Sequence, residues 1–181
     1  MPYELRALAE DDGCSSLSLG LPSLVPLKTF LRKEAKRLHR DSLARTSVLV
    51  ESGQARVWAY ITLVCTHVAV QRFGSETPVD DFRYADFPAV KLARLAVDSA
   101  LQGQGVGAQL VDFALGLTVK HIAPYAGCRF LVVDAKPDSV GFYRRKGFTT
   151  IGLATNTADT FTPMFIDLQR LDMQPSEGTS R

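Results

Sequence analysis

Hydrophobic and polar residues follow two different periods along this chain. Alternating or uninterrupted apolar residues over a short stretch are typical of strands, and apolar residues every three or four positions are typical of helices. We expect strands at residues 3–8, 46–52, 55–71, 89–98, 128–134, 147–155 and 160–171. We expect helices at residues 22–43, 105–121 and 137–146. The two periods together indicate an α/β protein.

Two connections predict how these strands pair. A short turn with the sequence SGQ separates strands 46–52 and 55–71, which favours an antiparallel hairpin. Strand 89–98, helix 105–121 and strand 128–134 form a βαβ unit, whose strands we expect to be parallel with a right-handed crossover. Because antiparallel strands precede and follow this unit, the predicted fold class is α/β with a mixed central sheet.

Length and composition favour one globular domain. The chain has 181 residues, of which 46% are hydrophobic and 22% are charged, and its net charge is only +2. That charge does not by itself indicate a nucleic-acid partner. We expect a single domain at residues 1–172 and a flexible tail at 173–181, where the sequence is polar and contains proline and glycine.

The cysteines and the N-terminus point to a cytoplasmic protein. Cys14, Cys65 and Cys128 are odd in number and widely spaced, so we expect three reduced thiols. No histidine cluster accompanies them, and we predict no metal site. The N-terminus lacks a basic region followed by an apolar one, so no secretory signal is expected. The apolar runs are strand-length, which argues against a membrane span.

Three glycines at every second position stand between the strand and the helix of the βαβ unit. A Walker A loop needs GxxxxGK[ST] and a dinucleotide fingerprint needs GxGxxG, whereas Gly103, Gly105 and Gly107 are spaced GxGxG. Glycines let a backbone approach a ligand closely, and a helix N-terminus offers unpaired N–H groups and a positive dipole end. The pattern therefore predicts an anion site that needs no lysine. A glycine-rich turn without a ligand remains the alternative.

The sequence around these glycines resembles the GCN5-related N-acetyltransferase (GNAT) family. The hexapeptide QGQGVG matches the family's pyrophosphate loop, Q/R-x-x-G-x-G/A, and it is preceded by RLAVD and followed by FYRRKGF. These motifs cover residues 94–148 in the family's order. The resemblance implies the GNAT fold, in which a mixed central sheet has a splayed parallel strand pair around the pyrophosphate-binding loop and helix. It also implies acetyl-CoA as the co-substrate.

A narrower resemblance, to the tRNA-acetylating toxin branch of this family, covers most of the chain. LKTFLRKEA is similar to that branch's L-x-x-F-L-x-x-x-A, and FPAVKLARLAVD is similar to its P-x-x-x-L-x-R-L-A-V-D. The final MFIDL also fits. The chain departs from the branch in having VVDA where VVHA is common, and in being less basic.

The family resemblance assigns roles to specific residues. It implies that the backbone of Leu95, Ala96 and Val97 pairs with pantetheine, and that the Val97 amide faces the thioester carbonyl. It implies that Phe142 contacts the cofactor and that Tyr143 is the general acid for the leaving thiolate. Packing of Tyr143 beside Phe142 is the alternative. The amides implied to bind the pyrophosphate belong to Gln102, Gly103, Gln104, Gly105, Val106, Gly107 and Ala108.

A general base is not evident in the sequence. The candidates are Glu34, Glu51, Asp98 and Asp134, and nothing in the pattern selects one of them. For Asp134 we favour a helix-capping or solvent-facing role. The α-amino group of an aminoacyl ester is weakly basic, so a strong base is not required. We expect His39, His67 and His121 to be structural or exposed.

The predicted helix 22–43 is rich in basic residues. One acid, Glu34, stands among Lys28, Arg32, Lys33, Lys36, Arg37 and Arg40. Two interpretations remain open: a footprint for the RNA phosphate backbone, or the solvated face of an amphipathic helix.

Together these observations predict an acetyl-CoA-dependent N-acetyltransferase. The narrower resemblance implies that the acceptor is the α-amino group of aminoacyl-tRNA, and that the protein is a toxin paired with a ribbon-helix-helix antitoxin. A homodimer is also expected from the resemblance. Two alternatives stay open: an acetyltransferase of a small-molecule or protein amine, and a non-catalytic CoA-binding module.

Overall fold

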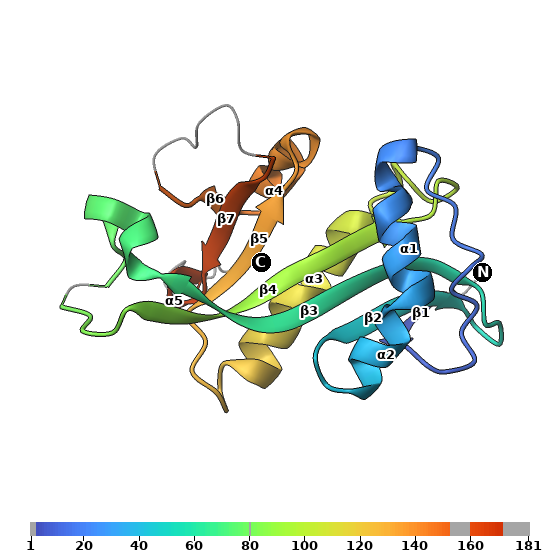
Figure 1. Cartoon of the computed structure of the whole chain (residues 1–181), viewed down its shortest axis with the longest axis horizontal. Helices are drawn as coiled ribbons and strands as arrows, with labels where there is room; N and C mark the ends of the chain where they lie inside the picture. The colour runs from blue at the N-terminus through green and yellow to red at the C-terminus, as the bar shows by residue number, and fades with distance from the viewer. Residues whose placement is uncertain (1–2, 80, 153–159, 172–181) are drawn as a thin grey trace, which may run out of the picture. The chain divides into compact units, whose positions relative to one another are not determined.

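The computed structural model describes residues 3–79, 81–152 and 160–171 (Figure 1). The strands are β1 (Tyr3–Ala7), β2 (Arg45–Glu51), β3 (Val57–Ala69), β4 (Asp86–Val97), β5 (Phe130–Ala135), β6 (Thr149–Thr150) and β7 (Thr162–Asp167). The α-helices are α1 (Val25–Lys33), α2 (Ala35–Arg40), α3 (Val106–Leu117), α4 (Val140–Arg145) and α5 (Leu168–Leu171). Shorter helical turns are η1 (Pro22–Leu24), η2 (Val70–Glu76), η3 (Thr118–Ile122) and η4 (Pro137–Ser139).

The basic segment 22–43 is helical as predicted, but it is not one helix. It begins with η1, continues as α1 and α2, and ends at Arg40. Prolines stand in the first turns of η1 and α1, where the missing N–H has no helical partner to lose. Glu34 separates α1 from α2 with φ −120° and ψ −36°. Its N–H still donates to the Phe30 carbonyl at 2.9 Å, so the segment is kinked at Glu34 and not interrupted.

The C-terminal strands are shorter than the sequence pattern predicts. Within predicted strand 147–155, only Thr149–Thr150 pairs as β6, and residues 153–155 lie outside the described part of the chain. The predicted strand 160–171 becomes β7 followed by α5. The change occurs at Asp167, whose carboxylate accepts the N–H of Gln169 at 3.1 Å and caps the turn. The predicted tail 173–181 also lies outside the described residues.

The strands form one mixed sheet in the order β1-β2-β3-β4-β5-β7-β6. β2 and β3 pair antiparallel as the predicted hairpin, and β1 pairs antiparallel with β2. β4 and β5 are neighbours connected through α3 and form the predicted parallel pair. β5 and β6 both pair antiparallel with β7. The predicted mixed α/β fold class is therefore confirmed, whereas the splay of the parallel pair stays a prediction.

The chain divides into two compact units, and β3 and β4 pass through both. The first unit contains the described residues of Met1–Cys65 together with Lys91–Gly116. The second contains those of Thr66–Val90 and Leu117–Arg181. The single domain expected at 1–172 stays a prediction. No helix in the described part of the chain is long and apolar enough to span a membrane.

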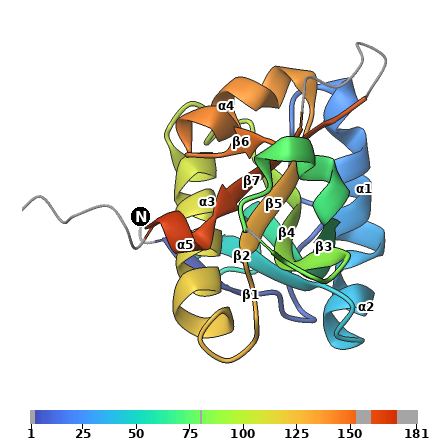
Figure 2. The same ribbon diagram turned by 90° about the vertical axis from the view of Figure 1, so that its left-hand side faces the viewer.

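The first unit has helices on both faces of its strands. α1 and α2 lie on one face and α3 on the other (Figure 2). Phe30, Leu31 and Ala35 of α1 and α2 pack into a core with Val48 and Tyr60 of β2 and β3. The second unit has a separate core rich in aromatic rings, in which Phe73, Phe87, Phe130 and Phe165 contact one another in edge-to-face or tilted pairs.

Candidate functional site

The loop between β4 and α3 has the backbone conformation that its glycines predict. Gly103 has φ 77° and Gly105 has φ 82°, in the left-handed region that side chains with a Cβ rarely adopt. A Cβ built at either position meets no heavy atom within 4 Å. The glycines are therefore required by the backbone conformation and not by crowding, and the space beside them is open.

Amide groups of this loop and of the first turn of α3 have no backbone acceptor. The first N–H of the helix to be bonded is that of Gln109, which donates to the Gly105 carbonyl at 3.1 Å. The Gln104 N–H makes a long bond of 3.4 Å to the Leu101 carbonyl. Within the described residues, backbone acceptors are missing for the amides of Gln102, Gly103, Gly105, Val106, Gly107 and Ala108. Together with the helix dipole these groups offer the donors and the positive potential that an anion site needs.

Two glutamine side chains hold the loop to its own surroundings. Gln102 donates from Nε2 to the carbonyl of Val97 at 2.9 Å and lies 3.5 Å from that of Leu19. Gln104 donates to the Ala100 carbonyl at 2.9 Å. The structure thus brings the two predicted cofactor-binding stretches of the first unit, 95–97 and 102–108, into direct contact at Gln102.

Asp98, a candidate base in the sequence, is instead a structural carboxylate. Its side chain is 2% exposed. One oxygen accepts the N–H of Ser18 at 2.9 Å and the other accepts that of Ala100 at 3.0 Å. Sequence reasoning missed this role, although an Asp two residues before the amide that it accepts is the usual signature of an Asx turn.

Tyr143 lies in α4 of the second unit, packed between aromatic rings. Its ring contacts those of Phe142 and Phe148, with centroids 5.0 and 5.4 Å away. The residue is 7% exposed, and burial raises the pKa of its phenol to about 12. Among the residues that the structure describes, its hydroxyl has no hydrogen-bond partner. The ring is thus fixed by packing, as the alternative interpretation expected. The phenol stays protonated, and its hydroxyl donates to no group of the described residues.

The other titratable candidates have simpler environments. Glu34 and Asp134 are exposed, and Glu51 is half-buried. His39 accepts the N–H of Thr46 at its Nδ1, 3.1 Å away, and burial lowers its pKa. His67 and His121 are exposed, so the predicted structural or exposed roles of the three histidines are confirmed. In the described ranges no cluster of His, Cys, Asp and Glu could hold a metal ion.

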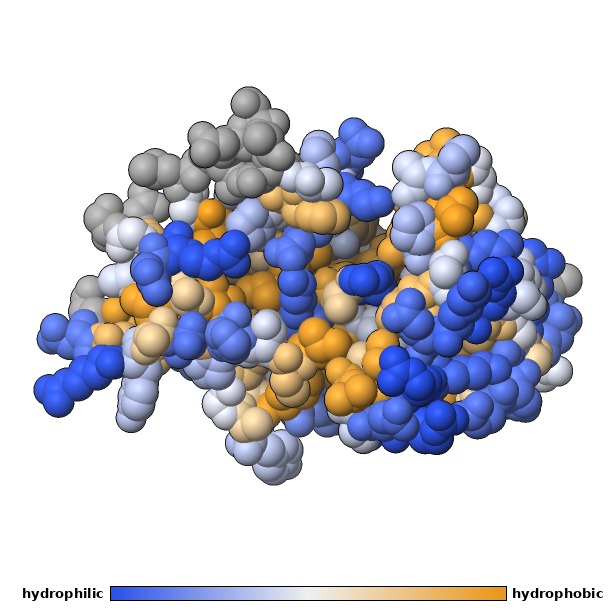
Figure 3. All heavy atoms as spheres, viewed as in Figure 1, coloured by the Kyte–Doolittle hydropathy of each residue, from blue (hydrophilic) through white to orange (hydrophobic). Residues whose placement is uncertain are grey.

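The basic residues of α1 and α2 fall into two groups. Lys36 donates to the carbonyls of Glu10 and Asp12, and Arg37 and Arg40 each lie within 4 Å of an Asp41 oxygen. By contrast, no hydrogen-bond or ion-pair partner in the described residues is found for Lys28, Arg32 and Lys33. Figure 3 shows hydrophilic side chains gathered over these two helices. We call Lys28, Arg32 and Lys33 the unpaired basic group.

Comparisons with known proteins identify the family of this chain. A family model described as an acetyltransferase (GNAT) domain matches residues 83–168. A curated tRNA-acetylating toxin from Mycobacterium tuberculosis (strain ATCC 25618 / H37Rv) is 32% identical over 145 residues, which make up 76% of this chain and 79% of that protein.

Solved structures agree with the fold. AtaT complexed with acetyl-methionyl-tRNAfMet has a TM-score of 0.81 at 24% identity and covers 95% of this chain and 98% of its own. AtaTR bound with AcCoA has a TM-score of 0.77 at 24% identity, with 94% and 96% covered. A further bacterial toxin has a TM-score of 0.82 at 21% identity, with 99% and 98% covered.

Proposed function

The chain belongs to the GNAT family of acetyltransferases, and on that premise we propose that it transfers acetyl from acetyl-CoA to the α-amino group of an aminoacyl-tRNA. The observation that carries the proposal is the glycine loop, in which open space beside Gly103 and Gly105 adjoins backbone amides without acceptors. The acceptor follows the curated relative, which is a tRNA-acetylating toxin.

The residues of the loop fit a diphosphate. The unpaired amides and the N-terminus of α3 supply donors and a positive potential for two neighbouring phosphates without a cationic side chain. The open space at the glycines lets the phosphate oxygens approach the backbone. In the proposed arrangement the backbone of Leu95, Ala96 and Val97 holds the pantetheine arm, and Phe142 contacts the cofactor.

Bound acetyl-CoA supplies an activated acyl thioester. The Val97 N–H is proposed to donate to the thioester oxygen as negative charge develops there, the usual electrostatic contribution to acyl transfer. The α-amino nitrogen forms a bond to the thioester carbonyl carbon, the C–S bond breaks, and the Tyr143 hydroxyl donates its proton to the departing sulfur. The proton lost by the nitrogen restores the phenol. Its environment supports this role, because burial keeps the phenol protonated and the fold leaves the proton unused.

The unpaired basic group supports a nucleic-acid acceptor. Cations without partners among the described residues are available to phosphates, whereas Lys36, Arg37 and Arg40 already have partners. This division favours contact with the RNA phosphate backbone for Lys28, Arg32 and Lys33. It favours a solvated or structural role for Lys36, Arg37 and Arg40. We further propose a cytoplasmic toxin with a ribbon-helix-helix antitoxin, and a homodimer as its assembly.

One transfer assay tests the acceptor. Acetyl-CoA labelled in the acetyl group is incubated with the protein and with aminoacyl-tRNA, deacylated tRNA, a free amino acid ester, or a mixture of lysine-containing peptides. The proposal expects label on the aminoacyl ester only when it is attached to tRNA, and its release by mild alkali that hydrolyses the ester.

Each alternative has its own outcome in that assay. Equal labelling of the free ester would replace tRNA by a small-molecule amine, and labelled peptides would replace it by a protein amine. Binding of acetyl-CoA with no transfer to any of these acceptors would favour the non-catalytic CoA-binding module.

A further inference from the structure

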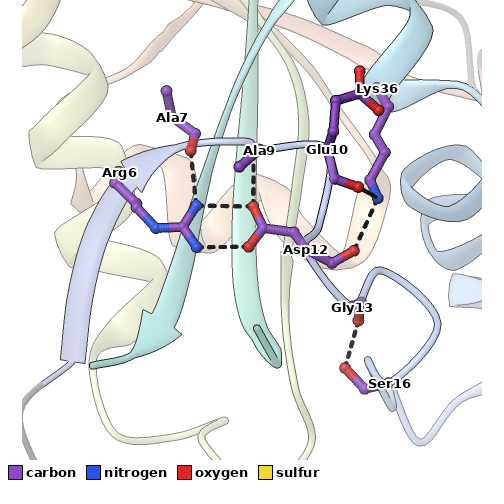
Figure 4. Close-up of polar contacts among 8 residues, drawn as sticks. All are labelled: Arg6, Ala7, Ala9, Glu10, Asp12, Gly13, Ser16 and Lys36. Carbon is purple, nitrogen blue, oxygen red and sulfur yellow. Dashed lines mark hydrogen bonds and ion pairs between the residues drawn. The ribbon is translucent and has the colours of Figure 1, made fainter. Parts of the chain in front are cut away.

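The segment from Leu8 to Gly20, which we call the N-terminal segment, is held at two points by buried carboxylates. At its start Asp12 is 3% exposed and accepts two bonds from the Arg6 guanidinium, at 2.6 and 2.9 Å. The same carboxylate accepts the N–H of Ala9 at 2.7 Å. Figure 4 shows this fork facing the carboxylate, with the Lys36 amine directed at the neighbouring carbonyls.

Asp12 remains ionised at neutral pH in this setting. Burial acts to raise the pKa of its carboxyl, but the hydrogen bonds from Arg6 and Ala9 outweigh burial and lower the pKa. The anchor at Asp12 thus joins the N-terminal segment to β1 and α2. In the described part of the chain, the hydrogen bonds of Asp12 go to Arg6, Ala9, Cys14 and Lys36 and not to the glycine loop.

The second anchor joins the end of the same segment to the start of the glycine loop. The Asp98 carboxylate accepts the Ser18 N–H, and the Ser18 carbonyl accepts the Ser99 N–H at 2.7 Å. Ser18 is therefore hydrogen-bonded to residues 98 and 99 through both its N–H and its carbonyl. Asp98 also accepts the Ala100 N–H, and its carbonyl accepts that of Leu101 at 2.9 Å.

Further contacts hold this anchor in place. The Asp98 N–H donates to the Trp58 carbonyl at 2.7 Å, and the Arg56 guanidinium lies 3.8 Å from the carboxylate. Gln102 adds a brace from the loop itself, with its Nε2 bonded to Val97 and 3.5 Å from the Leu19 carbonyl. The turn of residues 98–102 is therefore fixed from β3, from β4 and from the N-terminal segment.

The left-handed glycines that follow this turn have no packing of their own. Apart from the adjoining residues of the loop, no atom in the described part of the chain lies within 4 Å of a Cβ at Gly103 or Gly105, so packing does not hold their conformation. The direction in which the loop amides point must then be set by the residues just before them. Because φ and ψ of each residue orient the next amide, an error at residue 98 is carried along the whole loop.

We propose that Asp98 is a positioning residue for acetyl-CoA, which with the Gln102 side chain fixes the glycine loop in its anion-binding form. This inference rests on the proposed function of the loop. The ligand contacts remain backbone amides, and Asp98 acts on them only through the turn. The N-terminal segment is the fixed support for that turn.

The test compares the two carboxylates that hold the same segment. Asp98→Asn puts an amide NH2 where a carboxylate oxygen accepted a backbone N–H. Asp12→Asn puts one where an oxygen accepted an N–H of the Arg6 guanidinium or of the Ala9 backbone. Both should lower the melting temperature, because a buried hydrogen-bond acceptor is lost. Calorimetric titration with acetyl-CoA should show an affinity weakened about tenfold or more in Asp98→Asn, and unchanged within about twofold in Asp12→Asn.

Equal weakening in both variants, or none in Asp98→Asn, would overturn the inference. If Asp98→Asn does not fold, a second pair of variants, at the exposed residues Gln102 and Gln109, tests the same inference. Gln102→Ala should weaken acetyl-CoA binding about threefold to tenfold with little change in melting temperature. Gln109→Ala, which alters an exposed glutamine on α3, should change neither. Failure of the unaltered protein to bind acetyl-CoA would instead contradict the proposed function.

Discussion

The glycine loop and the helix that bears Tyr143 present the hydrogen-bond donors of the proposed site in two opposite ways. In the loop the donors are backbone amides, the residues from Gln102 to Gly105 are exposed, and the conformation depends on left-handed glycines. In α4 the donor is one side chain, 7% exposed and packed between Phe142 and Phe148. A substitution can change the donors of the loop only by changing its backbone conformation. In α4, removing the one hydroxyl oxygen of Tyr143 removes the proposed donor.

This difference predicts how each region responds to substitution. Tyr143 packs through its ring, and its proposed reaction uses only the hydroxyl, so a substitution can remove the reaction without lowering stability. In the glycine loop the two effects cannot be separated, because any residue that restores ordinary backbone dihedral angles also changes the direction of the amides. The experiments below test that contrast, from the largest expected effect to the smallest.

Tyr143→Phe should give the largest effect. It keeps the ring contacts and removes only the hydroxyl, so turnover should fall on the order of 10²-fold or more. Acetyl-CoA affinity and melting temperature should stay near those of the unaltered protein, because no hydrogen bond of the fold is lost. Turnover is measured with labelled acetyl-CoA and aminoacyl-tRNA, and affinity by calorimetry.

Tyr60→Phe is the matched control for that variant. The Tyr60 hydroxyl donates to the Leu27 carbonyl at 2.7 Å, so its removal should lower stability by about 1 kcal/mol with turnover kept within about threefold. Full turnover in Tyr143→Phe would show that its ring only packs.

Gly105→Ala should weaken acetyl-CoA binding by about tenfold or more, because an alanine at φ 82° is strained by about 1 kcal/mol and relaxes toward negative φ. Gly53, in the β2–β3 turn, has φ 79° and equally open surroundings, so Gly53→Ala carries the same strain without a ligand nearby. Thermal shift with and without acetyl-CoA separates the two effects. A similar shift in both variants would mean that the loop amides do not bind the cofactor.

Neutralising the unpaired basic group should weaken tRNA binding by about tenfold at low salt. With Lys28, Arg32 and Lys33 replaced by glutamine, the plot of log affinity against log salt should lose up to about 0.9 in slope for each phosphate contact removed. Acetyl-CoA binding should not change, since its anion site uses amides. The comparison variant Arg37→Gln/Arg40→Gln removes two paired cations and should have the smaller effect.

If the salt slope is identical in the triple variant and the unaltered protein, these helices do not contact the RNA phosphates. That result would also shift the acceptor toward a small-molecule or protein amine.

The pH dependence should show the smallest effect. Because burial raises the pKa of Tyr143 to about 12, the phenol stays protonated throughout the range from pH 6 to 9, and its ionisation should not reduce turnover there. Its contribution to stability is fully present below the ordinary tyrosine pKa near 10 and is lost as pH rises toward 12. Turnover that falls between pH 8 and 9 in the unaltered protein, with tyrosine absorbance changing in parallel, would contradict this assignment.

Local chemistry determined what the sequence could predict. The spacing of Gly103 and Gly105 at a strand–helix junction permits left-handed turns, and the start of a helix leaves amides without acceptors, because both properties belong to the backbone. The same holds for the β2–β3 hairpin and for the βαβ unit, which follow from periodicity and connection length. The pattern overestimated β6 and missed the kink at Glu34.

Only the tertiary structure decided which of several similar side chains are buried in the fold and which are exposed. Asp98 and Asp134 looked alike as candidate bases, but one is buried with its oxygens bonded to Ser18 and Ala100, and the other is exposed. Lys33 and Lys36 stand three residues apart in one basic run, yet only Lys36 is committed to backbone carbonyls. Such partners come from residues up to 80 positions away in sequence, as for Ser18 and Asp98, so no local pattern contains them. Burial and hydrogen-bond pairing are properties of the packed chain, and they decide which charges hold the fold and which are left for a ligand.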